Sequence, residues 1–319
     1  MKKIGIVILN WNGKEDTLAC LKSMREFPIS NFQFPIFVVD NGSTDGSATA
    51  LRNFQFPISN FQFHLIENKK NLGFSEGNNV GIKAALKVGS DFVMLLNNDT
   101  VLEKNLIVQL ITTAEGGVPL RGKTAIKPEE IGIISPKIYF AKGFEFHKDR
   151  YKKTEQGKVI WYVGGMVSWN NVLASHRGVD EVDNGQYDKV VETDFATGAC
   201  MFIKREVFQK IGFLDKNYFL YWEDADFCQR AKRAGFKILY APSAYLWHKV
   251  AQSSAIGSEL NDYYITRNRL LFGSRFAPLR SRFALLRESV RLLFNGRPWQ
   301  RRGVLDYYFG NFGKGSFNP

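Results

Sequence analysis

Apolar residues in the first third of the chain come in short runs, and polar residues follow each run at once. Short unbroken runs are typical of strands buried on both faces of a parallel sheet. Apolar positions at helical spacing separate these runs, so strand and helix alternate four times. This order predicts an α/β fold with a doubly wound, mainly parallel sheet flanked by helices. The predicted strands are residues 4–9, 37–39, 64–66 and 92–96, and the predicted helices are residues 14–26, a short segment ending near residue 53, and a segment around residues 80–88.

The run at residues 92–96 ends directly in Asn97, Asn98, Asp99 and Thr100. In open α/β sheets, ligands bind at the carboxyl ends of the strands. A carboxylate at that edge can hold a hard divalent cation, and the cation can hold a diphosphate. The same residue types also suit a solvated turn that caps the next helix. On this stretch alone, both interpretations stay open.

An eight-residue segment, Phe-Pro-Ile-Ser-Asn-Phe-Gln-Phe, occurs at residues 27–34 and again at residues 56–63. Each copy follows a predicted helix and precedes a predicted strand. The proline in each copy argues against a coiled coil. We interpret the two copies as insertions in surface connections, because loops accept extra length at small cost. We assign them no role.

Residues 117–124 match the phosphate-binding pattern G-x-x-x-x-G-K-[ST] letter for letter. The motif works only with a strand before it and a helix after it, so that backbone N–H groups face the phosphates. Here a predicted helix at residues 106–115 precedes the segment, and Pro128 follows it closely. The segment is therefore better interpreted as an exposed loop, and a P-loop-type NTPase remains an alternative function.

Polar chemistry returns in the second half of the chain. A polar turn at residues 195–199 leads into an apolar strand, and an aromatic run at residues 218–222 leads into Glu223, Asp224 and Asp226 at the start of a predicted helix. Favourable acid capping of a helix N-terminus explains one or two of these carboxylates but not the aromatic residues before them. Four histidines are present. We expect His147 and His176 at the surface, whereas His248 is the one histidine predicted near a carboxylate cluster.

The overall composition is that of a globular protein, with 45% hydrophobic and 23% charged residues in a chain of 319 residues. Cys20, Cys200 and Cys228 are widely separated, which indicates free thiols rather than disulfides or a zinc site. The apolar run near the N-terminus is too short for a signal peptide core, and no window approaches a membrane span. These features predict a cytoplasmic protein.

The formal charge of +12 is concentrated near the C-terminus. Residues 261–319 contain ten arginines and one lysine against three acids, which predicts a helical basic extension over residues 259–319. Such an extension suits anionic partners. Its apolar face either packs on the rest of the protein or lies at an anionic membrane surface, and both interpretations stay open. No nucleic-acid-binding motif accompanies the charge. The apolar positions are Leu279, Phe283, Leu286, Val290 and Leu293, flanked by Arg280, Arg282, Arg287 and Arg291.

Taken together, these ordered motifs resemble the inverting glycosyltransferases of family 2, in particular a rhamnosyltransferase-like branch. The resemblance covers roughly residues 4–275, apart from the duplicated segments and the loop at 116–130. It implies a GT-A fold, which is Rossmann-like, with a catalytic domain at residues 1–258 and the helical basic extension at 259–319. Within the catalytic domain, it implies a nucleotide-binding half at about residues 1–115 and an acceptor half at about residues 131–258.

The resemblance also implies roles for individual residues. Asp224 matches the general base, and Asp99 and His248 match ligands of a divalent metal, Mn²⁺ or Mg²⁺. Asn97 stands where most of the family has the first acid of its DXD motif, so it is at most a neutral ligand. The residues implied to bind the nucleotide are Asn10, Trp11, Asn12, Asp40, Asn41, Gly73, Asn78, Asn97 and Asn98, and those implied to bind the acceptor are Thr197, Gly198, Ala199, Trp222, Glu223 and Asp226.

The chemistry expected from these roles is a single displacement with inversion, which needs one base and one metal. A glycoside hydrolase would instead need a pair of carboxylates flanking the bond. The resemblance implies transfer of rhamnose from dTDP-rhamnose to a cell-surface glycan precursor or a lipid-linked acceptor. It also implies an enzyme that is cytoplasmic, with a peripheral position on the inner face of the plasma membrane if the segment 279–294 contacts lipid. A non-catalytic protein that binds sugar nucleotides or nucleic acid remains the second alternative.

Overall fold

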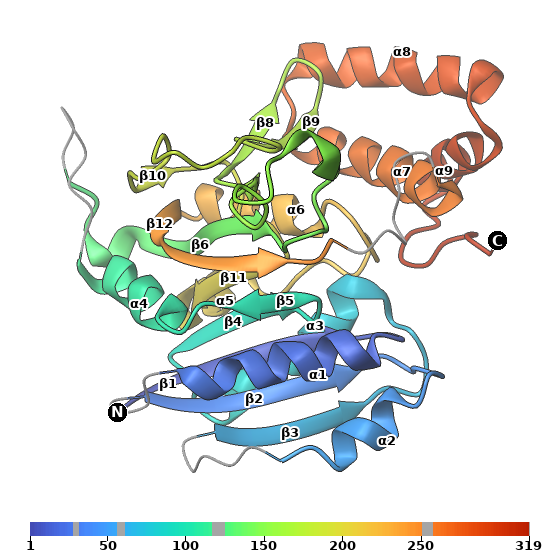
Figure 1. Ribbon diagram of the computed structural model, residues 1–319. Helices are drawn as coiled ribbons and strands as arrows, with labels where there is room; N and C mark the ends of the chain where they lie inside the picture. The colour runs from blue at the N-terminus through green and yellow to red at the C-terminus, as the bar shows by residue number, and fades with distance from the viewer. Residues whose placement is uncertain (28–31, 56–60, 117–124, 251–257, 319) are drawn as a thin grey trace.

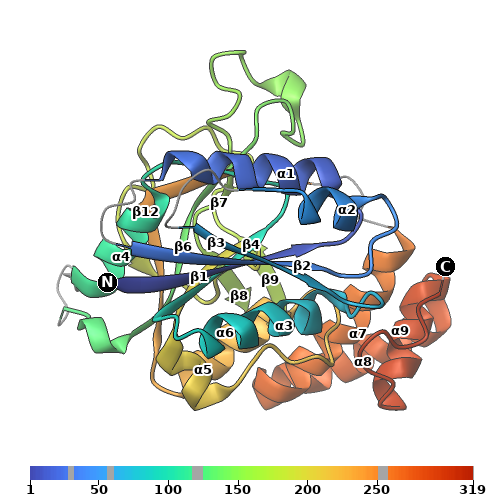
Figure 2. The ribbon, with the colours of Figure 1, turned by 90° about the horizontal axis from the view of Figure 1, so that it is seen from below.

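The computed structural model describes residues 1–27, 32–55, 61–116, 125–250 and 258–318, and in these residues one large sheet runs through the molecule with helices on both faces (Figures 1 and 2). The strands of this sheet are β1 Lys2–Asn10, β2 Phe32–Asp40, β3 Phe61–Glu67, β4 Phe92–Asn97, β5 Thr100–Leu102, β6 Ile131–Phe140, β7 Ile160–Tyr162, β10 Val191–Glu192, β11 Cys200–Lys204 and β12 Lys237–His248. A separate hairpin pairs β8 Gly165–Ser168 with β9 Leu173–His176.

The predicted parallel sheet is confirmed in the first half of the chain. β1 lies between β2 and β4, β3 lies outside β2, and all three pairings are parallel. The register sets Asn10 of β1 beside Asp40 of β2, and Leu9 beside Asn97 of β4. The carboxyl ends of these strands therefore meet at one edge of the sheet, as expected for a ligand site in an open α/β fold.

Helices cover the two faces of this half unequally. Figure 2 shows α1 and α2 on one face, with α3, α5 and α6 on the other. The order of strands reverses at β1, because β2 and β3 are added on one side of β1 and β4 follows on its other side. Ligands bind at such a switch point. The bounds of these helices and of the neighbouring α4 are α1 Lys14–Ser23, α2 Ser47–Arg52, α3 Gly73–Lys87, α4 Leu106–Gly116, α5 Arg205–Ile211 and α6 Glu223–Arg233.

The second half of the sheet is mixed. β11 runs antiparallel to both β4 and β6, while β12 runs parallel to β6. β11 therefore joins the two halves. The turn at residues 195–199 leads into β11 and lies directly beside the end of β4. The amide of Asn97 donates to the carbonyl of Ala199 at 3.0 Å, so this turn and the end of β4 are held together.

The described parts of the duplicated segments, Phe27, residues 32–34 and residues 61–63, belong to the core and its strands, so the expectation of surface insertions was wrong for them. β2 and β3 begin inside the second half of each copy, and Phe34 pairs with Phe61 in the parallel register. The two rings stack at 5.2 Å between centroids, and Phe27, Phe34 and Phe61 are all buried in the core. The described ends of the two copies thus extend two neighbouring strands and add buried aromatic rings to the core. Residues 28–31 and 56–60 lie outside the described residues.

The segment that matched the P-loop pattern, residues 117–124, also lies outside the described residues. Its flanks do not supply the surroundings that the motif needs. α4 precedes it, and a single 3-10 turn at Pro128–Glu130 leads into β6 after it. The strand before and the helix after are therefore both missing from the described flanks.

The two histidines expected at the surface differ. The side chain of His147 is 49% exposed, beside Asp180, as expected. His176 instead packs edge-on against the rings of Trp161 and Tyr162, with centroids 4.5 and 5.0 Å away. Burial lowers the pKa of His176 to about 4, so it is neutral at physiological pH. Its side chain is partly buried among these rings, so the expectation of a surface residue was wrong. The three cysteines are buried free thiols, as predicted.

Three further helices follow the sheet, α7 Glu259–Phe276, α8 Leu279–Asn295 and α9 Pro298–Tyr308. In Figure 1, α7 lies next to the sheet, and α8 lies outside it. Most of the apolar stripe predicted on α8 does not pack on the protein, although Leu293 is partly buried against the core. Leu279, Phe283 and Phe294 are 70%, 67% and 73% exposed, whereas Ser281, Leu285 and Ser289 are buried instead. The interpretation that this stripe packs on the catalytic core is therefore wrong for its exposed members and holds for Leu293. Among the helices of the described residues, none is both long and apolar enough to cross a bilayer.

Candidate functional site

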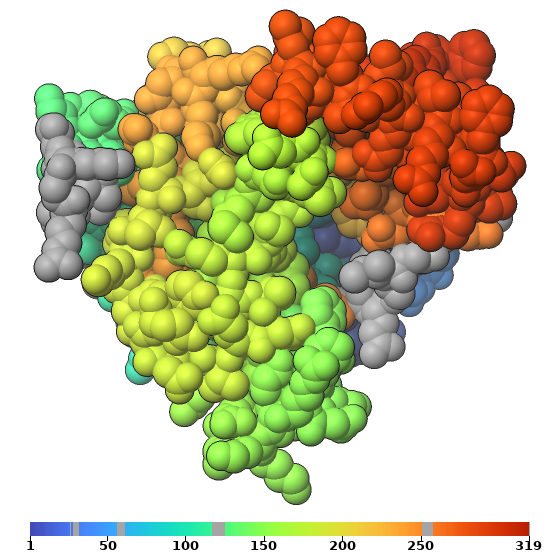
Figure 3. Space-filling view, turned by 90° about the horizontal axis from the view of Figure 1, so that it is seen from above, coloured from blue at the N-terminus to red at the C-terminus, as the bar shows by residue number. Residues whose placement is uncertain are grey.

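A pocket of about 1190 Å³ lies at the sheet edge where β1, β2 and β4 end. Seen from above, atoms of the N-terminal half lie at the bottom of a hollow between residues of the middle segment and the C-terminal helices (Figure 3). Three parts of the chain line the pocket. They are the strand-end loops with Trp11, Asn41 and residues 97–99, the loop at residues 70–76, and a C-terminal wall made by residues 216–220, 260, 264 and 310–318.

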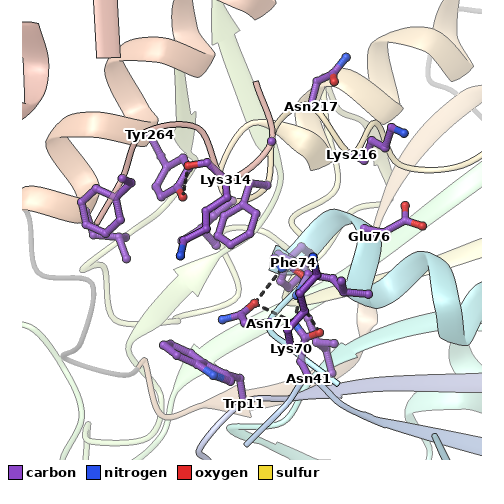
Figure 4. Close-up of a pocket in the computed structure, with 18 of the residues that line it drawn as sticks. Trp11, Asn41, Lys70, Asn71, Phe74, Glu76, Lys216, Asn217, Tyr264 and Lys314 are labelled. Atoms are coloured by element: carbon purple, nitrogen blue, oxygen red, sulfur yellow. Dashed lines mark hydrogen bonds between the residues drawn. The ribbon is translucent and has the colours of Figure 1, made fainter. Parts of the chain in front are cut away.

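The strand-end loops are tied together below the pocket floor. The amide of Asn10 donates to Asp40 at 2.7 Å, and its oxygen accepts from the hydroxyl of Thr17 at 2.8 Å. Asn12 accepts from the backbone N–H of Thr44 at 2.7 Å. Asn10 and Asp40 are buried, and they hold the loops rather than line the pocket. Trp11 is 55% exposed and forms part of the pocket wall (Figure 4).

The loop before α3 is shaped by one glycine. Gly73 has a φ of +80°, and a Cβ at this position would lie 2.7 Å from the carbonyl oxygen of Phe219. This close approach lets the Phe74 amide donate to that same oxygen at 2.6 Å. Asn41 reaches into the loop and donates to Asn71 at 3.0 Å, while Asn78 donates to the carbonyl of Phe74 from inside. Of these, Asn41 and Gly73 line the pocket, whereas Asn78 supports it.

Two residues predicted as metal ligands lie together, although they are far apart in sequence. Nε2 of His248 is 3.0 Å from Oδ1 of Asp99, and both side chains are largely buried. The pairing of β12 with β5 aligns His248 with Thr100, the residue after Asp99. Asn97 and Asn98 lie beside them on the pocket wall, and Asn98 is held by a hydrogen bond to Thr17.

The Asp99–His248 pair fits a divalent cation. Nδ1 of His248 has no hydrogen-bond partner in the described part of the chain, an uncommon state for a buried polar atom. Within the described ranges, no group of three or more His, Cys, Asp or Glu side chains forms a cation site. Mg²⁺ is commonly held by one or two protein carboxylates while substrate phosphates and water complete its shell, and Asp99 supplies one such carboxylate. The donor set therefore matches a metal that binds together with a phosphate-bearing ligand.

Asp224 lies on the other side of the β4–β11 junction. It accepts from the backbone N–H of Gly198 at 3.0 Å and of Ala225 at 2.7 Å. The ring of Phe74 packs closely against Gly198 from the pocket side, and a Cβ added at Gly198 would lie 3.0 Å from that ring. Burial raises the pKa of the Asp224 carboxyl, and these backbone hydrogen bonds oppose the rise. A half-buried carboxylate of raised pKa behind a pocket has the properties of a general base.

The aromatic run before α6 is held in a strained conformation. Phe219, Tyr221 and Trp222 all have a positive φ, of 61°, 67° and 74°. Such angles cost about 1–3 kcal/mol each in residues other than glycine, and they persist only where surrounding contacts fix them. Here Asn268 of α7 donates to the carbonyls of Tyr218, Leu220 and Tyr221 at 2.7–2.9 Å. The C-terminal helices thus hold the loop that places Asp224.

The other residues predicted to contact the acceptor face inward. Asp226 is completely buried and bonds to Tyr218, Arg230 and Arg275 at 2.7–3.0 Å. Trp222 packs against Phe272 of α7 at 4.8 Å between centroids. Their burial does not support direct contact with an acceptor.

Glu223 is also buried, and its Oε2 has no hydrogen-bond partner in the described residues. Burial, with the charge of Asp224 beside it, raises the pKa of Glu223 well above its usual range. Thr197 and Ala199 are buried in the turn, where the Thr197 hydroxyl accepts from the Ala199 amide. Of the turn residues, Gly198 makes the contact to Asp224.

Three lysines on the pocket wall, Lys70, Lys216 and Lys314, were not predicted as site residues. Lys70 lies three residues before Gly73, which the resemblance implied to bind the nucleotide, so its position gave a usable signal. Lys314 gave none, because it lies more than 200 residues from the strand-end loops, in a stretch without a motif.

Comparison with known proteins finds glycosyltransferases among the similar sequences. A hexosyltransferase of low-salt glycan biosynthesis from Haloferax volcanii is 27% identical over 236 residues, 74% of this chain, and the chain spans 63% of that protein's length. An N-acetylglucosaminyl-diphospho-decaprenol L-rhamnosyltransferase from Mycobacterium tuberculosis is 25% identical over 241 residues, 75% of this chain and 73% of that protein.

Solved structures share the fold at low sequence identity. A mannosyltransferase from Pyrobaculum calidifontis, in complex with GDP-mannose and Mn²⁺, aligns over 98% of this chain and 76% of its own, with a TM-score of 0.53 and 14% identity. GalNAc-T7 with UDP, GalNAc and Mn²⁺ aligns over 94% of this chain and 58% of its own, with a TM-score of 0.60 and 14% identity. The GT-A architecture expected from the sequence is confirmed. The model of the glycosyltransferase-like family 2 matches residues 2–270, and the chain belongs to this family.

Proposed function

We propose that this protein is a metal-dependent, inverting glycosyltransferase that moves a sugar from a nucleoside diphosphate donor to an acceptor hydroxyl. One observation carries the proposal. The Asp99–His248 pair and Asp224 are fixed to the same junction, because Asn97 bonds to Ala199 and Gly198 bonds to Asp224. A cation site and a candidate base are thereby held on either side of one short backbone turn.

In this proposal the nucleotide occupies the pocket. Trp11 offers an exposed aromatic face for the base or ribose, and Asn41 and Gly73 shape the wall beside it. Asn10, Asn12, Asp40 and Asn78 act through the loops that they hold. Asp99, with His248, would hold Mn²⁺ or Mg²⁺, which when bound neutralises charge on the diphosphate. Asn97 and Asn98 offer neutral amides next to Asp99.

The step that Asp224 serves is a single displacement. The acceptor oxygen forms a bond to the anomeric carbon as the bond to the diphosphate breaks, and the electron pair leaves with the diphosphate. Asp224 takes the proton of the acceptor hydroxyl, and its raised pKa suits that task because it makes the carboxylate a stronger base. Gly198 and Ala225 keep the carboxylate aimed by their N–H groups.

The donor and acceptor are proposed from the relatives. The mycobacterial relative is named for rhamnosyl transfer to a sugar linked to decaprenyl diphosphate, and the archaeal relative for hexosyl transfer. We propose dTDP-rhamnose as the donor and a polyisoprenyl-diphosphate-linked sugar as the acceptor, within the synthesis of a cell-surface polysaccharide. The Mn²⁺ in two structures of the same fold supports the choice of metal.

A donor screen by thermal melting tests the proposal. The protein is melted with dTDP-rhamnose, UDP-N-acetylglucosamine, GDP-mannose and ATP, each with Mn²⁺ or with EDTA. A donor present at a hundred times its Kd adds about 2.7 kcal/mol of apparent stability. We expect one sugar nucleotide to raise the melting temperature, and more so with Mn²⁺. Stabilisation by ATP alone, or by none of the ligands, would reject the proposal.

The outer face of α8 supports a peripheral position on a membrane that carries the acceptor. Leu279, Phe283, Leu286, Val290 and Phe294 are all exposed and recur at helical spacing. Arg280, Arg287 and Arg291 follow one edge of this stripe and are exposed too. An apolar stripe bordered by arginines complements an anionic bilayer surface. We propose that α8 lies on the cytoplasmic leaflet.

Vesicle binding tests this orientation. Replacing Phe283 and Phe294 together by serine should lower sedimentation with phosphatidylglycerol vesicles about tenfold or more. The variant lacks the two aromatic rings whose burial in the bilayer surface favours binding. Leu173, an exposed apolar residue of β9, gives the matched control Leu173→Ser. Equal binding of the double variant and the control would remove α8 from the membrane surface, and neutral vesicles should bind the wild type weakly.

A further inference from the structure

The C-terminal tail at residues 310–318 is part of the pocket, although it follows the last helix. Gly310, Lys314, Phe317 and Asn318 line the same wall as Tyr264 of α7 and Asn217 of the loop before α6. This wall faces the strand-end loops that hold Trp11 and Asn97. The tail was expected to belong to a basic extension beside the catalytic domain, and in the structure it closes the pocket of that domain.

Backbone hydrogen bonds and one buried ring hold the tail against the rest of the protein. The amide of Gly313 donates to the carbonyl of Asn217 at 2.9 Å, and the amide of Ser316 donates to Asp306 at 2.8 Å. Hydrogen bonds from Tyr263 and Ser316 lower the pKa of Asp306, although its burial acts in the opposite direction. Phe317 is buried, with its ring 4.9 Å from that of Trp299. These contacts give the tail a defined path across the pocket.

Lys314 is positioned by its own main chain. The hydroxyl of Tyr264 donates to the carbonyl of Lys314 at 3.0 Å, and the side chain is exposed to the pocket. Figure 4 shows this side chain extending from the tail toward Trp11 and Asn71 on the facing wall. None of the ion pairs in the described residues involves Lys314, so no acid among these residues neutralises its charge.

We propose that Lys314 binds the diphosphate of the donor and stays with it as the nucleoside diphosphate leaves. The proposal rests on the proposed function and deepens it. Lys314 has no acid partner among the described residues and lines the same pocket as Asp99, a proposed metal ligand, so its ammonium complements a ligand that carries two phosphates. The electron pair of the breaking bond goes to the diphosphate, so a positive group in the same pocket as Asp99 stabilises the charge that develops there. The tail thus completes the donor site of the catalytic domain.

Calorimetric titration with nucleotides tests Lys314. The probes are dTDP, UDP and GDP, with thymidine, uridine and guanosine as the phosphate-free counterparts, all measured with Mn²⁺. We compare the wild type with Lys314→Ala, Lys314→Gln and Lys314→Arg. Each substitution leaves the backbone carbonyl that Tyr264 binds, so the tail should keep its place. Lys153, an exposed lysine far from Lys314 in the sequence, provides the control Lys153→Ala.

We expect Lys314→Ala and Lys314→Gln to raise the Kd of the preferred diphosphate about tenfold, because a charge-assisted contact is lost. Lys314→Arg should keep most of the affinity, and the affinity for the nucleoside should not change. Equal losses for the nucleoside and the diphosphate, or no loss at all, would overturn the role of Lys314 and leave the proposed function intact. A wild type that binds no nucleotide would overturn both.

Discussion

Asp224→Asn should abolish transfer while the donor still binds. Asparagine keeps the size and a hydrogen-bond acceptor for the Gly198 amide, but it cannot take a proton from the acceptor hydroxyl. A general base contributes about 10²- to 10⁴-fold to the rate, and we expect kcat to fall by that factor. Asp224 lies behind Gly198 and not on the pocket wall, so the Kd of the donor should stay within about twofold, a change of only a few tenths of a kcal/mol. Transfer assays and calorimetry together measure both quantities.

Asp226→Asn is the matched control, two residues further along the same helix. Asp226 is completely buried between Arg230, Arg275 and Tyr218, and removing its charge takes the carboxylate partner from Arg230, while Arg275 keeps its ion pair with Asp215. Breaking such a buried pair costs about 3 kcal/mol. We therefore expect Asp226→Asn to lower the melting temperature markedly and to lose activity only as far as it unfolds. An active, fully stable Asp226→Asn protein would contradict the structural role given to this residue.

The stability of Asp224→Asn relative to the wild type should depend on pH. Burial raises the pKa of both Asp224 and Glu223, so the folded protein favours their protonated forms. Groups of this kind stabilise the fold below their unfolded pKa, and that stability is lost as the pH rises through the folded pKa. At neutral pH the wild type carries this cost and the neutral asparagine does not. Asp224→Asn should thus be at least as stable as the wild type at pH 7, and the difference should shrink as the pH falls.

Asp99→Ala should remove the response to metal. Asp99 supplies the carboxylate at the end of β4, and His248 alone offers one neutral nitrogen to a hard cation that prefers oxygen ligands. Because the metal neutralises charge on the leaving diphosphate, we expect transfer to fall at least about 100-fold, several kcal/mol in the barrier. The protein itself should fold, since Asp99 lies on the pocket wall. Rates measured over a Mn²⁺ titration check this expectation.

His248→Ala separates the two members of the pair. If His248 is a ligand, its loss should weaken the apparent affinity for Mn²⁺ while high Mn²⁺ restores much of the rate. Asp99→Ala should not recover at any Mn²⁺ concentration. Near-normal, metal-dependent transfer by Asp99→Ala would place the cation elsewhere and reject the site proposed at the end of β4.

The sequence predicted the strand ends well, and the physical reason is local. A short apolar run followed by Asn, Asp or Gly indicates both where a buried strand stops and which side chains gather at the sheet edge. Asn10, Asp40 and Asn97 meet there for that reason. The nearness of His248 to Asp99 followed only from the family resemblance, because nothing in the spacing of 149 residues indicates that β12 pairs with β5.

Other parts depended on tertiary packing that no local pattern indicates. Asp224 and Asp226 are two residues apart on a helix and therefore point in different directions, and only the packing of α7 decides which of them is buried. Phe34 and Phe61 looked like parts of an insertion until their strands were paired. Lys314 reaches the pocket because Tyr264 and Asn217 hold the tail, and these contacts join segments about 50 and 100 residues apart.

The central claim is a single displacement between the metal site at Asp99 and the base at Asp224. The most direct measurement is the anomeric configuration of the product, by ¹H NMR, after transfer from the donor that the screen identifies to a polyisoprenyl-diphosphate-linked sugar. We predict that the configuration is inverted relative to the donor and that product formation needs Mn²⁺ or Mg²⁺. A product that retains the donor configuration would contradict the account. Retention requires a second displacement and an enzyme nucleophile, and the proposed mechanism gives no residue that role.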